Sequence, residues 1–260
     1  MSFEGRSLIV TGATGAAGQA LLRRLAGASV ALVVRDRDRG GEAAREANVT
    51  PRAIEIADAR DPAAFEAALE RAAKALGAVH GIAHLVGSFV LAPPSRVDAA
   101  VFEEHLRVNL TSAYVVVRFA ERALRDDGGS VVLVSSAAAT VGLANHEVVA
   151  AAKAGIEGLA RAAAATLAVR KIRVNVVAPG LVDATMTRSI FERPDAVAAS
   201  VELHVLGRTG RGDDVANAVA FLLDEERAGW ITGSVLRVDG GLASVRGRAR
   251  RRLERGSSGG

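Results

Sequence analysis

The strongest constraint on the fold is an alternation of short β-branched segments with alanine-rich stretches of helical periodicity, which runs along almost the whole chain. Near-continuous apolar strands are typical of sheets that helices cover on both faces. Strand–helix alternation favours parallel strands joined by right-handed crossovers. The sequence therefore predicts an α/β fold with a single doubly wound parallel sheet of about seven strands and about six helices. The expected strands are 7–11, 29–35, 53–58, 79–87, 130–136, 172–180 and 235–241.

No linker interrupts this pattern, so we expect one domain over residues 1–245 and a basic, disordered tail over 246–260. From Arg246 to Gly256 the tail carries six arginines and one glutamate. Subtracting this +5 from the net charge of +4 leaves about −1 for the rest of the chain. A basic tail can bind nucleic acid or acidic surfaces. A solvated, frayed end is the simpler interpretation, so nucleic acid is not an expected partner.

The composition excludes several classes of site. The chain has no cysteine, which rules out disulfides, thiolate metal sites and a thiolate nucleophile, and we expect no metal site. No apolar run approaches the roughly 18 residues of a membrane span, and the N-terminus lacks a basic-then-apolar leader. We therefore expect a cytoplasmic protein with no membrane partner.

A glycine-rich loop, TGATGAAG at 11–18, follows the first expected strand directly and precedes a helix. Gly12 can make a tight turn, and Gly15 or Gly18 can let the backbone approach a pyrophosphate at the helix N-terminus. The alternative is a helix-start turn that needs small residues for packing. The position of the loop favours a Rossmann-type dinucleotide site.

The end of the second strand bears on the choice of nucleotide. Val34 fills the position where an acid would favour NAD, and Arg35 follows it. An arginine accommodates the 2′-phosphate of NADP. We therefore favour NADP, with NAD possible if Asp36 reaches the ribose hydroxyls. Asp58, after the third strand, is placed either for the adenine amino group or as a helix or turn cap.

Further motifs follow in order along the chain. They are HLVG at 84–87, Asn109 in RVNLTSAY, Ser136 in LVSSAAA, Lys153 in AAAKAG, APGLV at 178–182 and WITGSVLRVDGG at 230–241. Together with the glycine loop they resemble the short-chain dehydrogenase/reductase family over nearly the whole chain. The loop is spaced as TGxxGxxG, with Ala16 in place of a glycine, and HLVG keeps only Gly87 of the family's Asn-Asn-Ala-Gly turn.

The resemblance implies a role for each matching residue. Ser136 and Lys153 would be catalytic, and Asn109 would hold a water. The cofactor would contact Gly12, Thr14, Gly15, Ala17, Gly18, Arg35, Asp58, Gly87, Lys153, Pro179, Gly180 and Val182. The family's closing motif commonly packs in a subunit interface, so the resemblance implies a homodimer or homotetramer.

One expected residue is absent. In the family a tyrosine four residues before the lysine transfers the proton, and here that position holds Val149. The only tyrosine, Tyr114, lies in another predicted helix. Loss of a positioned general acid typically lowers the rate by about 10² to 10⁴. Useful carbonyl reduction therefore requires a replacement.

His146 is the first candidate for that replacement. If the helix already includes it, His146 shares a face with Val149 and Lys153, and an imidazole titrates near neutral pH. Glu147 is a second candidate, although it points about 100° away. A plainer interpretation makes this segment a helix start, with Asn145 as N-cap and Glu147 as a first-turn acid.

The segment 185–207 is expected to form a lid over the substrate. It carries Met186, Ile190, Phe191 and Leu206, which favours a small apolar or aromatic substrate. Ala184 stands where the family usually places a threonine beside the nicotinamide.

Three functions remain open. The first is an NAD(P)(H)-dependent oxidoreductase acting on a small carbonyl or alcohol, with His146 or a water at Asn109 carrying the proton. The second is a non-catalytic NAD(P)-binding redox sensor or partner subunit. The third is lyase or isomerase chemistry in the same pocket. Ser136 and Asn109 favour the first, because a pure binder has little need of either.

Overall fold

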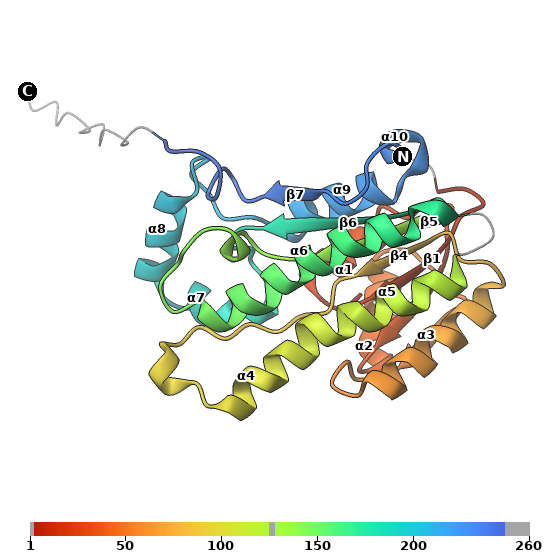
Figure 1. Cartoon of the computed structure of the whole chain (residues 1–260), viewed down its shortest axis with the longest axis horizontal. Helices are drawn as coiled ribbons and strands as arrows, with labels where there is room; N and C mark the ends of the chain where they lie inside the picture. The colour runs from red at the N-terminus through yellow and green to blue at the C-terminus, as the bar shows by residue number, and fades with distance from the viewer. Residues whose placement is uncertain (1–2, 125–127, 248–260) are drawn as a thin grey trace, which may run out of the picture.

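The computed structural model describes residues 3–124 and 128–247, which form a seven-stranded parallel sheet with helices on both faces (Figure 1). The strand order is β3-β2-β1-β4-β5-β6-β7, which confirms the predicted doubly wound α/β fold. The strands are β1 (Ser7–Thr11), β2 (Ser29–Val34), β3 (Ala53–Ile56), β4 (Gly81–His84), β5 (Gly129–Val134), β6 (Ile172–Pro179) and β7 (Val235–Val238).

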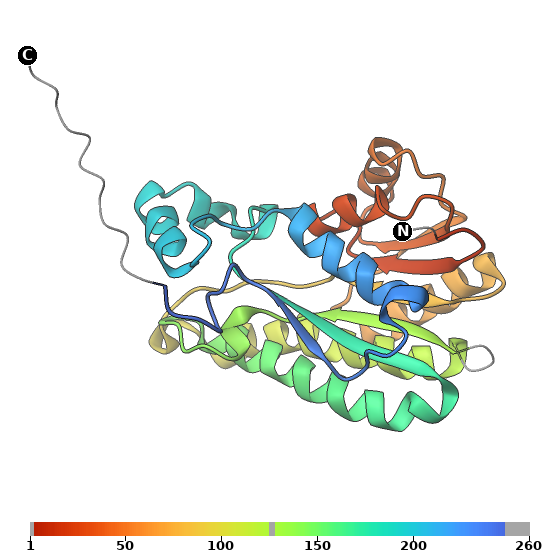
Figure 2. The ribbon, with the colours of Figure 1, turned by 90° about the horizontal axis from the view of Figure 1, so that it is seen from above.

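Six helices pack on the two faces of the sheet, and Figure 2 shows the two layers from above. One face carries α1 (Ala16–Leu22), α2 (Arg37–Glu46) and α9 (Gly212–Leu223). The other carries α3 (Pro62–Leu76), α5 (Ser112–Ala123) and α6 (Glu147–Leu167). Each layer packs its own apolar core against the sheet, which is why the strands are apolar on both sides.

Shorter helical segments account for the rest of the described chain. They are α4 (Ala99–Leu106), α7 (Arg188–Phe191), α8 (Pro194–Leu203), α10 (Glu225–Ala228), the π-helix η2 (Arg107–Thr111) and the 3-10 turns η1 (Pro94–Arg96), η3 (Ala137–Ala139), η4 (Ala168–Arg170) and η5 (Thr185–Thr187). The periodicity did not reveal the one-turn segments among them, because a helix of one turn shows too few repeats of its pattern.

The sequence predicted β1 with its observed bounds but extended several other strands too far. The segment expected over 79–87 ends as β4 at His84, and that expected over 130–136 ends as β5 at Val134. The residues beyond these ends leave the sheet at the carboxyl ends of its strands. Here the neighbouring strands β1 and β4 lead into their separate crossover connections. In such sheets this edge is where ligands bind.

The described residues contain no helix long and apolar enough to cross a membrane, and no cluster of potential metal ligands. Of the predicted basic tail, only Arg246 and Gly247 lie among the described residues.

Candidate active site

The glycine loop joins β1 to α1, and its path is fixed by close backbone contacts. Gly12 has a φ of +73°, and a Cβ added there would lie 2.7 Å from the carbonyl carbon of Leu85. A Cβ on Gly18 would lie 2.4 Å from the carbonyl oxygen of Gly12. Gly12 thus makes the predicted tight turn, and Gly18 serves the packing of α1 against that turn.

The exposed part of the loop fits a pyrophosphate. Gly15 is exposed and is the N-cap of α1, with no side chain bound to the first-turn amides. Thr14 and Ala17, on either side, are half-buried. Free amide groups at a helix start favour an anion. Of the two glycines predicted to approach the phosphates, the structure therefore favours Gly15.

Three charged residues surround the expected adenosine end. Arg35 is exposed directly after β2. One oxygen of Asp36 caps α2, because Asp38 N and Arg39 N donate to it at 2.9 and 3.1 Å. Asp58 caps a turn by accepting from Arg60 N at 2.9 Å. Hydrogen bonds from Arg60 also hold the pKa of Asp58 below its usual value.

Lys153 is buried rather than solvated, although it is a charged residue. Its Nζ donates to Val134 O at 3.0 Å, at the end of β5. Burial lowers the pKa of Lys153 to about 8. A Cβ on Gly87 would lie 3.3 Å from this Nζ and 3.0 Å from Asn109 Oδ1. Gly87, Asn109 and Lys153 thus converge, and the lack of a side chain at 87 keeps them close.

Ser136 leaves the sheet just beyond β5 and is the N-cap of η3. Its Oγ accepts from Ala138 N at 3.2 Å and so caps this turn. Because the hydroxyl accepts in this bond, its own hydrogen remains available to a ligand. The side chain is half-buried at the sheet edge, where a substrate oxygen can reach it.

Asn109 lies in the π-helix η2, a distortion that is frequent at functional sites. Its Nδ2 donates to Ser88 Oγ and to His105 O, both at 2.9 Å, and its Oδ1 accepts from Ser88 N at 3.2 Å. Both amide hydrogens are therefore used within the protein. The side chain clamps the turn at Gly87 and Ser88 in place.

Sequence reasoning missed two buried histidines next to this clamp. His84 bridges Thr11 Oγ1 at 2.8 Å and Ser112 Oγ at 2.9 Å. His105 Nδ1 lies 2.9 Å from Ser88 Oγ, and its Nε2 is buried without a hydrogen-bond partner. Burial, with a smaller effect of the Lys153 charge, lowers the pKa of His84 to about 3 and that of His105 to about 4. Both rings are therefore neutral at neutral pH.

The start of α6 differs from one prediction and agrees with another. His146, not Asn145, is the N-cap, so the predicted N-cap is wrong, and the helix does not include His146 as a shared face with Lys153 would require. Asn145 instead takes a left-handed φ of 64°. Glu147 is exposed in the first turn, as the helix-start interpretation predicted. The Val149 side chain is buried.

His146 nevertheless stays beside the site. Its Nδ1 lies 2.8 Å from Ala144 O, and its ring meets Phe89 edge-on with the centroids 5.9 Å apart. The main chain of Ala92 also bonds to the carbonyl of Asn145, so this loop lies along the segment that follows the Gly87 turn. Tyr114, by contrast, is half-exposed on α5.

The end of β6 forms the opposite wall. Gly180 packs against His204, since a Cβ there would lie 2.4 Å from Nε2, and that nitrogen accepts from Leu181 N at 3.1 Å. Pro179 ends β6, and the carbonyl of Val182 accepts from Thr187 Oγ1 at 2.6 Å. The hydroxyl in this contact belongs to Thr187. Ala184, which stands where the family usually places a threonine, has no hydroxyl to offer.

The predicted lid, 185–207, consists of η5, α7, α8 and their connections. Met186 and Leu206 are exposed, while Ile190 and Phe191 are half-buried. The Met186 methyl group would lie 3.9 Å from a Cβ on Gly87. The first turn of the segment therefore reaches the clamp around Lys153.

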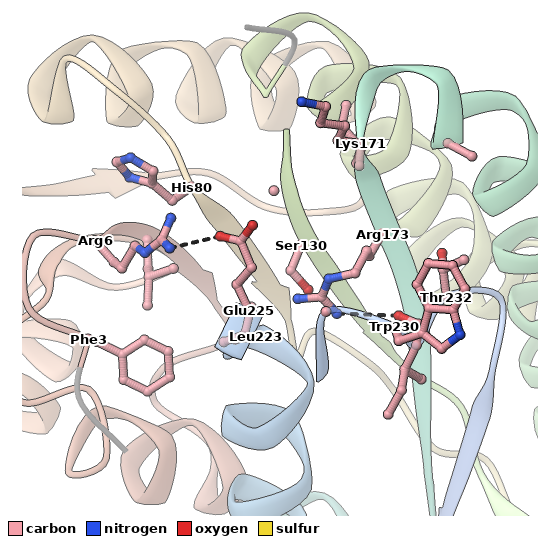
Figure 3. Close-up of a pocket in the computed structure, with 16 residues that line it drawn as sticks. Phe3, Arg6, His80, Ser130, Lys171, Arg173, Leu223, Glu225, Trp230 and Thr232 are labelled. Atoms are coloured by element: carbon pink, nitrogen blue, oxygen red, sulfur yellow. Dashed lines mark hydrogen bonds and ion pairs between the residues drawn. The ribbon is translucent and has the colours of Figure 1, made fainter. Parts of the chain in front are cut away.

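A separate cavity of about 470 Å³ lies at the amino ends of the strands (Figure 3). Arg173 donates there to the carbonyls of Leu222 and Ile231, and Arg6 pairs with Glu225 at 2.8 Å. Because doubly wound sheets bind ligands at the carboxyl ends of their strands, this cavity is not the cofactor site.

Comparisons with known proteins agree with the geometry of the edge. A family model described as enoyl-(acyl carrier protein) reductase matches residues 14–243. Cis-4-hydroxycyclohexanecarboxylate dehydrogenase of Sinomonas cyclohexanicum is 33% identical over 94% of this chain and 99% of its own. The 3-oxoacyl-[acyl-carrier-protein] reductase FabG of Escherichia coli is 31% identical over 94% of this chain and 100% of its own.

Solved structures give the same result. A short-chain type dehydrogenase/reductase from Mycobacterium ulcerans superimposes with a TM-score of 0.87 at 30% identity, covering 95% of this chain and 93% of its own. Levodione reductase superimposes with a TM-score of 0.87 at 25% identity, covering 94% and 100%. The glycine loop, the buried lysine and these matches together show that the chain belongs to the short-chain dehydrogenase/reductase family of NAD(P)-dependent oxidoreductases.

Proposed function

We propose that this protein uses NADP(H) to interconvert a small carbonyl compound and its alcohol, with a proton relay that does not use the family's tyrosine. The observation that carries the proposal is the buried ammonium of Lys153, held between the end of β5 and the Gly87 turn. A desolvated lysine with a lowered pKa in a ligand-binding edge is a functional group more often than a structural one.

The cofactor would lie along the carboxyl edge. Its pyrophosphate would meet Gly12, Thr14, Gly15 and Ala17, with Gly18 supporting the helix start. Its adenosine end would lie near Arg35 and Asp58, and its nicotinamide half near Gly87, Pro179, Gly180 and Val182. One oxygen of Asp36 caps α2, and the exposed Arg35 directly after β2 is a suitable partner for a 2′-phosphate, which supports NADP over NAD.

When bound, the reduced nicotinamide supplies a hydride to the carbonyl carbon. The Ser136 hydroxyl donates a hydrogen bond to the carbonyl oxygen, which orients the substrate and stabilises the charge that develops there. The Lys153 ammonium holds the ribose hydroxyls and adds positive potential at the same oxygen. These roles match the positions of both side chains at the end of β5.

Val149 cannot transfer a proton, so another group must do so. His146 donates from Nδ1 to Ala144 O, which leaves Nε2 to exchange a proton with water at the mouth of the site. A water near Asn109 is the alternative route. Of the two, His146 is favoured because the amide hydrogens of Asn109 are used by Ser88 and His105.

The lid supports a small, largely apolar or aromatic substrate. Two relatives, named for a hydroxycyclohexanecarboxylate and for 3-oxoacyl groups, make ring ketones and β-keto thioesters the first compounds to test. We also propose a homodimer or homotetramer, because edge strand β7 and the fully exposed Trp230 form a surface suited to a second copy.

The proposal is tested by titrating the full-length protein with NADPH and NADH in a calorimeter and by following NADPH oxidation over a panel of ketones. We expect tighter binding of NADPH and turnover of at least one ring ketone, which Ser136→Ala should suppress. Tight binding without turnover would instead identify a redox sensor. Failure to bind either nucleotide would overturn the assignment.

A further inference from the structure

The turn after β4 places a second hydroxyl, that of Ser88, beside Lys153. In the sheet, His84 of β4 pairs with Leu133 of β5, so both strands leave the same edge side by side. Ser88 lies four residues beyond that pair on one strand, and Ser136 lies three beyond it on the other. The Lys153 Nζ donates to Val134 O at 3.0 Å, and a Cβ added to Gly87 would lie 3.3 Å from the same nitrogen.

Two side chains fix the Ser88 hydroxyl. Asn109 Nδ2 donates to Ser88 Oγ at 2.9 Å, and His105 Nδ1 lies 2.9 Å from the same oxygen. Asn109 also binds the Ser88 amide and the carbonyl of His105, so the three residues form one closed unit. A serine held this firmly has a single orientation for its hydrogen.

The tautomer of His105 decides where that hydrogen points. The Nε2 of His105 is buried and has no partner, and an orphaned buried N–H is rarer than an unused acceptor. The proton therefore belongs on Nδ1, which donates to Ser88 Oγ. Asn109 and His105 then donate to the two lone pairs of the Ser88 oxygen. The O–H of Ser88 therefore points away from both residues.

Ser88 is more exposed than the two residues that hold its hydroxyl. The residue is half-buried while His105 and Asn109 behind it are buried. The lid lies over the same turn, with the Met186 methyl 3.9 Å from the Cβ position of Gly87. A ligand held at Lys153 beneath the lid would therefore lie beside the turn formed by Gly87 and Ser88.

We propose that the Ser88 hydroxyl, positioned by Asn109 and His105, is the second hydrogen-bond donor to the substrate oxygen and replaces the hydrogen bond of the missing phenol. This inference rests on the proposed function and adds a catalytic residue to it. Ser88 touches the substrate, whereas His105 and Asn109 are positioning residues. The ligand class is a carbonyl or alcohol oxygen that bridges Ser88 and Ser136.

The kinetic test is a double-mutant cycle in the full-length protein. Ser88→Ala should lower kcat by about 10²-fold, the effect of removing one preorganised donor, without changing NADPH affinity. His105→Leu should lower kcat similarly, and His105→Asn, which keeps a donor near the Nδ1 position, should restore most of it. The double variant Ser88→Ala/His105→Leu should be no slower than Ser88→Ala, because the two side chains act as a unit.

Thr166→Ala, which removes an exposed hydroxyl bonded to Ala162 O at the far end of α6, is the matched control and should keep wild-type kcat. Wild-type kcat in Ser88→Ala, or losses that multiply in the double variant, would overturn the proposal.

A second measurement does not need turnover. In protein labelled with ¹⁵N-histidine, the five histidines give resolvable ring signals, and those of His105 are the ones that His105→Asn removes. We expect a protonated Nδ1 that shifts in Ser88→Ala. A proton on Nε2 would mean that Ser88 donates to His105, and it would refute the inference even if the protein reduces ketones. If His105 carries its proton on Nδ1 but the protein reduces no ketone, the proposed function is refuted, while the arrangement of Ser88 and His105 stands.

Discussion

The glycine loop, residues 11–18, and the start of α6, residues 146–153, serve the same edge but are built differently. The loop is defined by its backbone, since a Cβ at Gly12 or Gly18 would collide with main-chain atoms. The start of α6 is defined by side chains, with Val149 buried and Lys153 buried one turn later. A backbone site tolerates little change, whereas one side chain can be exchanged and its role taken by a neighbour. This contrast supports the proposal that the glycine loop binds the cofactor while another side chain takes the role of the family's tyrosine.

The largest effect is expected in the loop. Gly12→Ala combines a left-handed φ with a Cβ 2.7 Å from Leu85 C. Strain and overpacking together should lower the free energy of unfolding by about 2 to 6 kcal/mol and abolish cofactor binding. Urea denaturation and calorimetry measure the two effects.

Gly5→Ala is the matched control, because Gly5 has the same φ of +73° with nothing within 4 Å of the added Cβ. It should show only the strain, about 1 to 2 kcal/mol, and bind the cofactor normally. Equal losses in both variants would show that conformation alone, and not the close backbone approach, defines the loop.

The second prediction concerns the buried charge of Lys153. Its pKa is lowered from 10.5 to about 8 in the folded chain, so between these values the unfolded chain binds more protons and stability rises with pH. Relative to Lys153→Met, the wild-type free energy of unfolding should therefore rise by about 3 kcal/mol from pH 8 to pH 10.5, at 1.36 kcal/mol per pKa unit.

Below pH 8 the difference between the two proteins should stay flat, because Lys153 is then charged in both states. Denaturant unfolding of both proteins across this range isolates the lysine, since all other groups are shared. If the difference in unfolding free energy between the two proteins does not change with pH, the Lys153 ammonium is solvated in the folded protein.

The same contrast explains how much the sequence could predict. Periodicity and the glycine loop predicted the sheet, because main-chain pairing follows from local patterns. The cluster of Ser88, His105 and Asn109 could not be predicted, because His105 lies on α4 and meets Ser88 only through the fold. No sequence signal marked His105, because it is the buried residue of α4 while the apolar Val101 and Phe102 of the same helix are exposed. His146 was misplaced by one residue at the helix boundary, the least certain feature of such predictions.

The third prediction concerns proton transfer. His146→Ala should lower kcat by about 10²-fold, at the lower end for a general acid because water has access to this half-buried ring. Glu147→Gln is the control on the neighbouring exposed residue, and rates across pH values measure both. A larger loss in Glu147→Gln than in His146→Ala would move the proton route to the first turn of α6.

The smallest expected effect is on nucleotide affinity and concerns the side chain of Arg35, directly after β2. Arg35→Ser removes the only basic side chain between β2 and the cap of α2, and loss of one charge-assisted hydrogen bond, about 1.5 to 3 kcal/mol, weakens NADPH binding by about 10- to 100-fold. NADH binding should not change, because NADH lacks the 2′-phosphate. Arg37→Ser, two residues on and equally exposed, controls for general charge. If Arg35→Ser weakens the binding of NADH and NADPH equally, the arginine acts through long-range charge and not through the 2′-phosphate. The preference between the two nucleotides would then be set by the glycine loop.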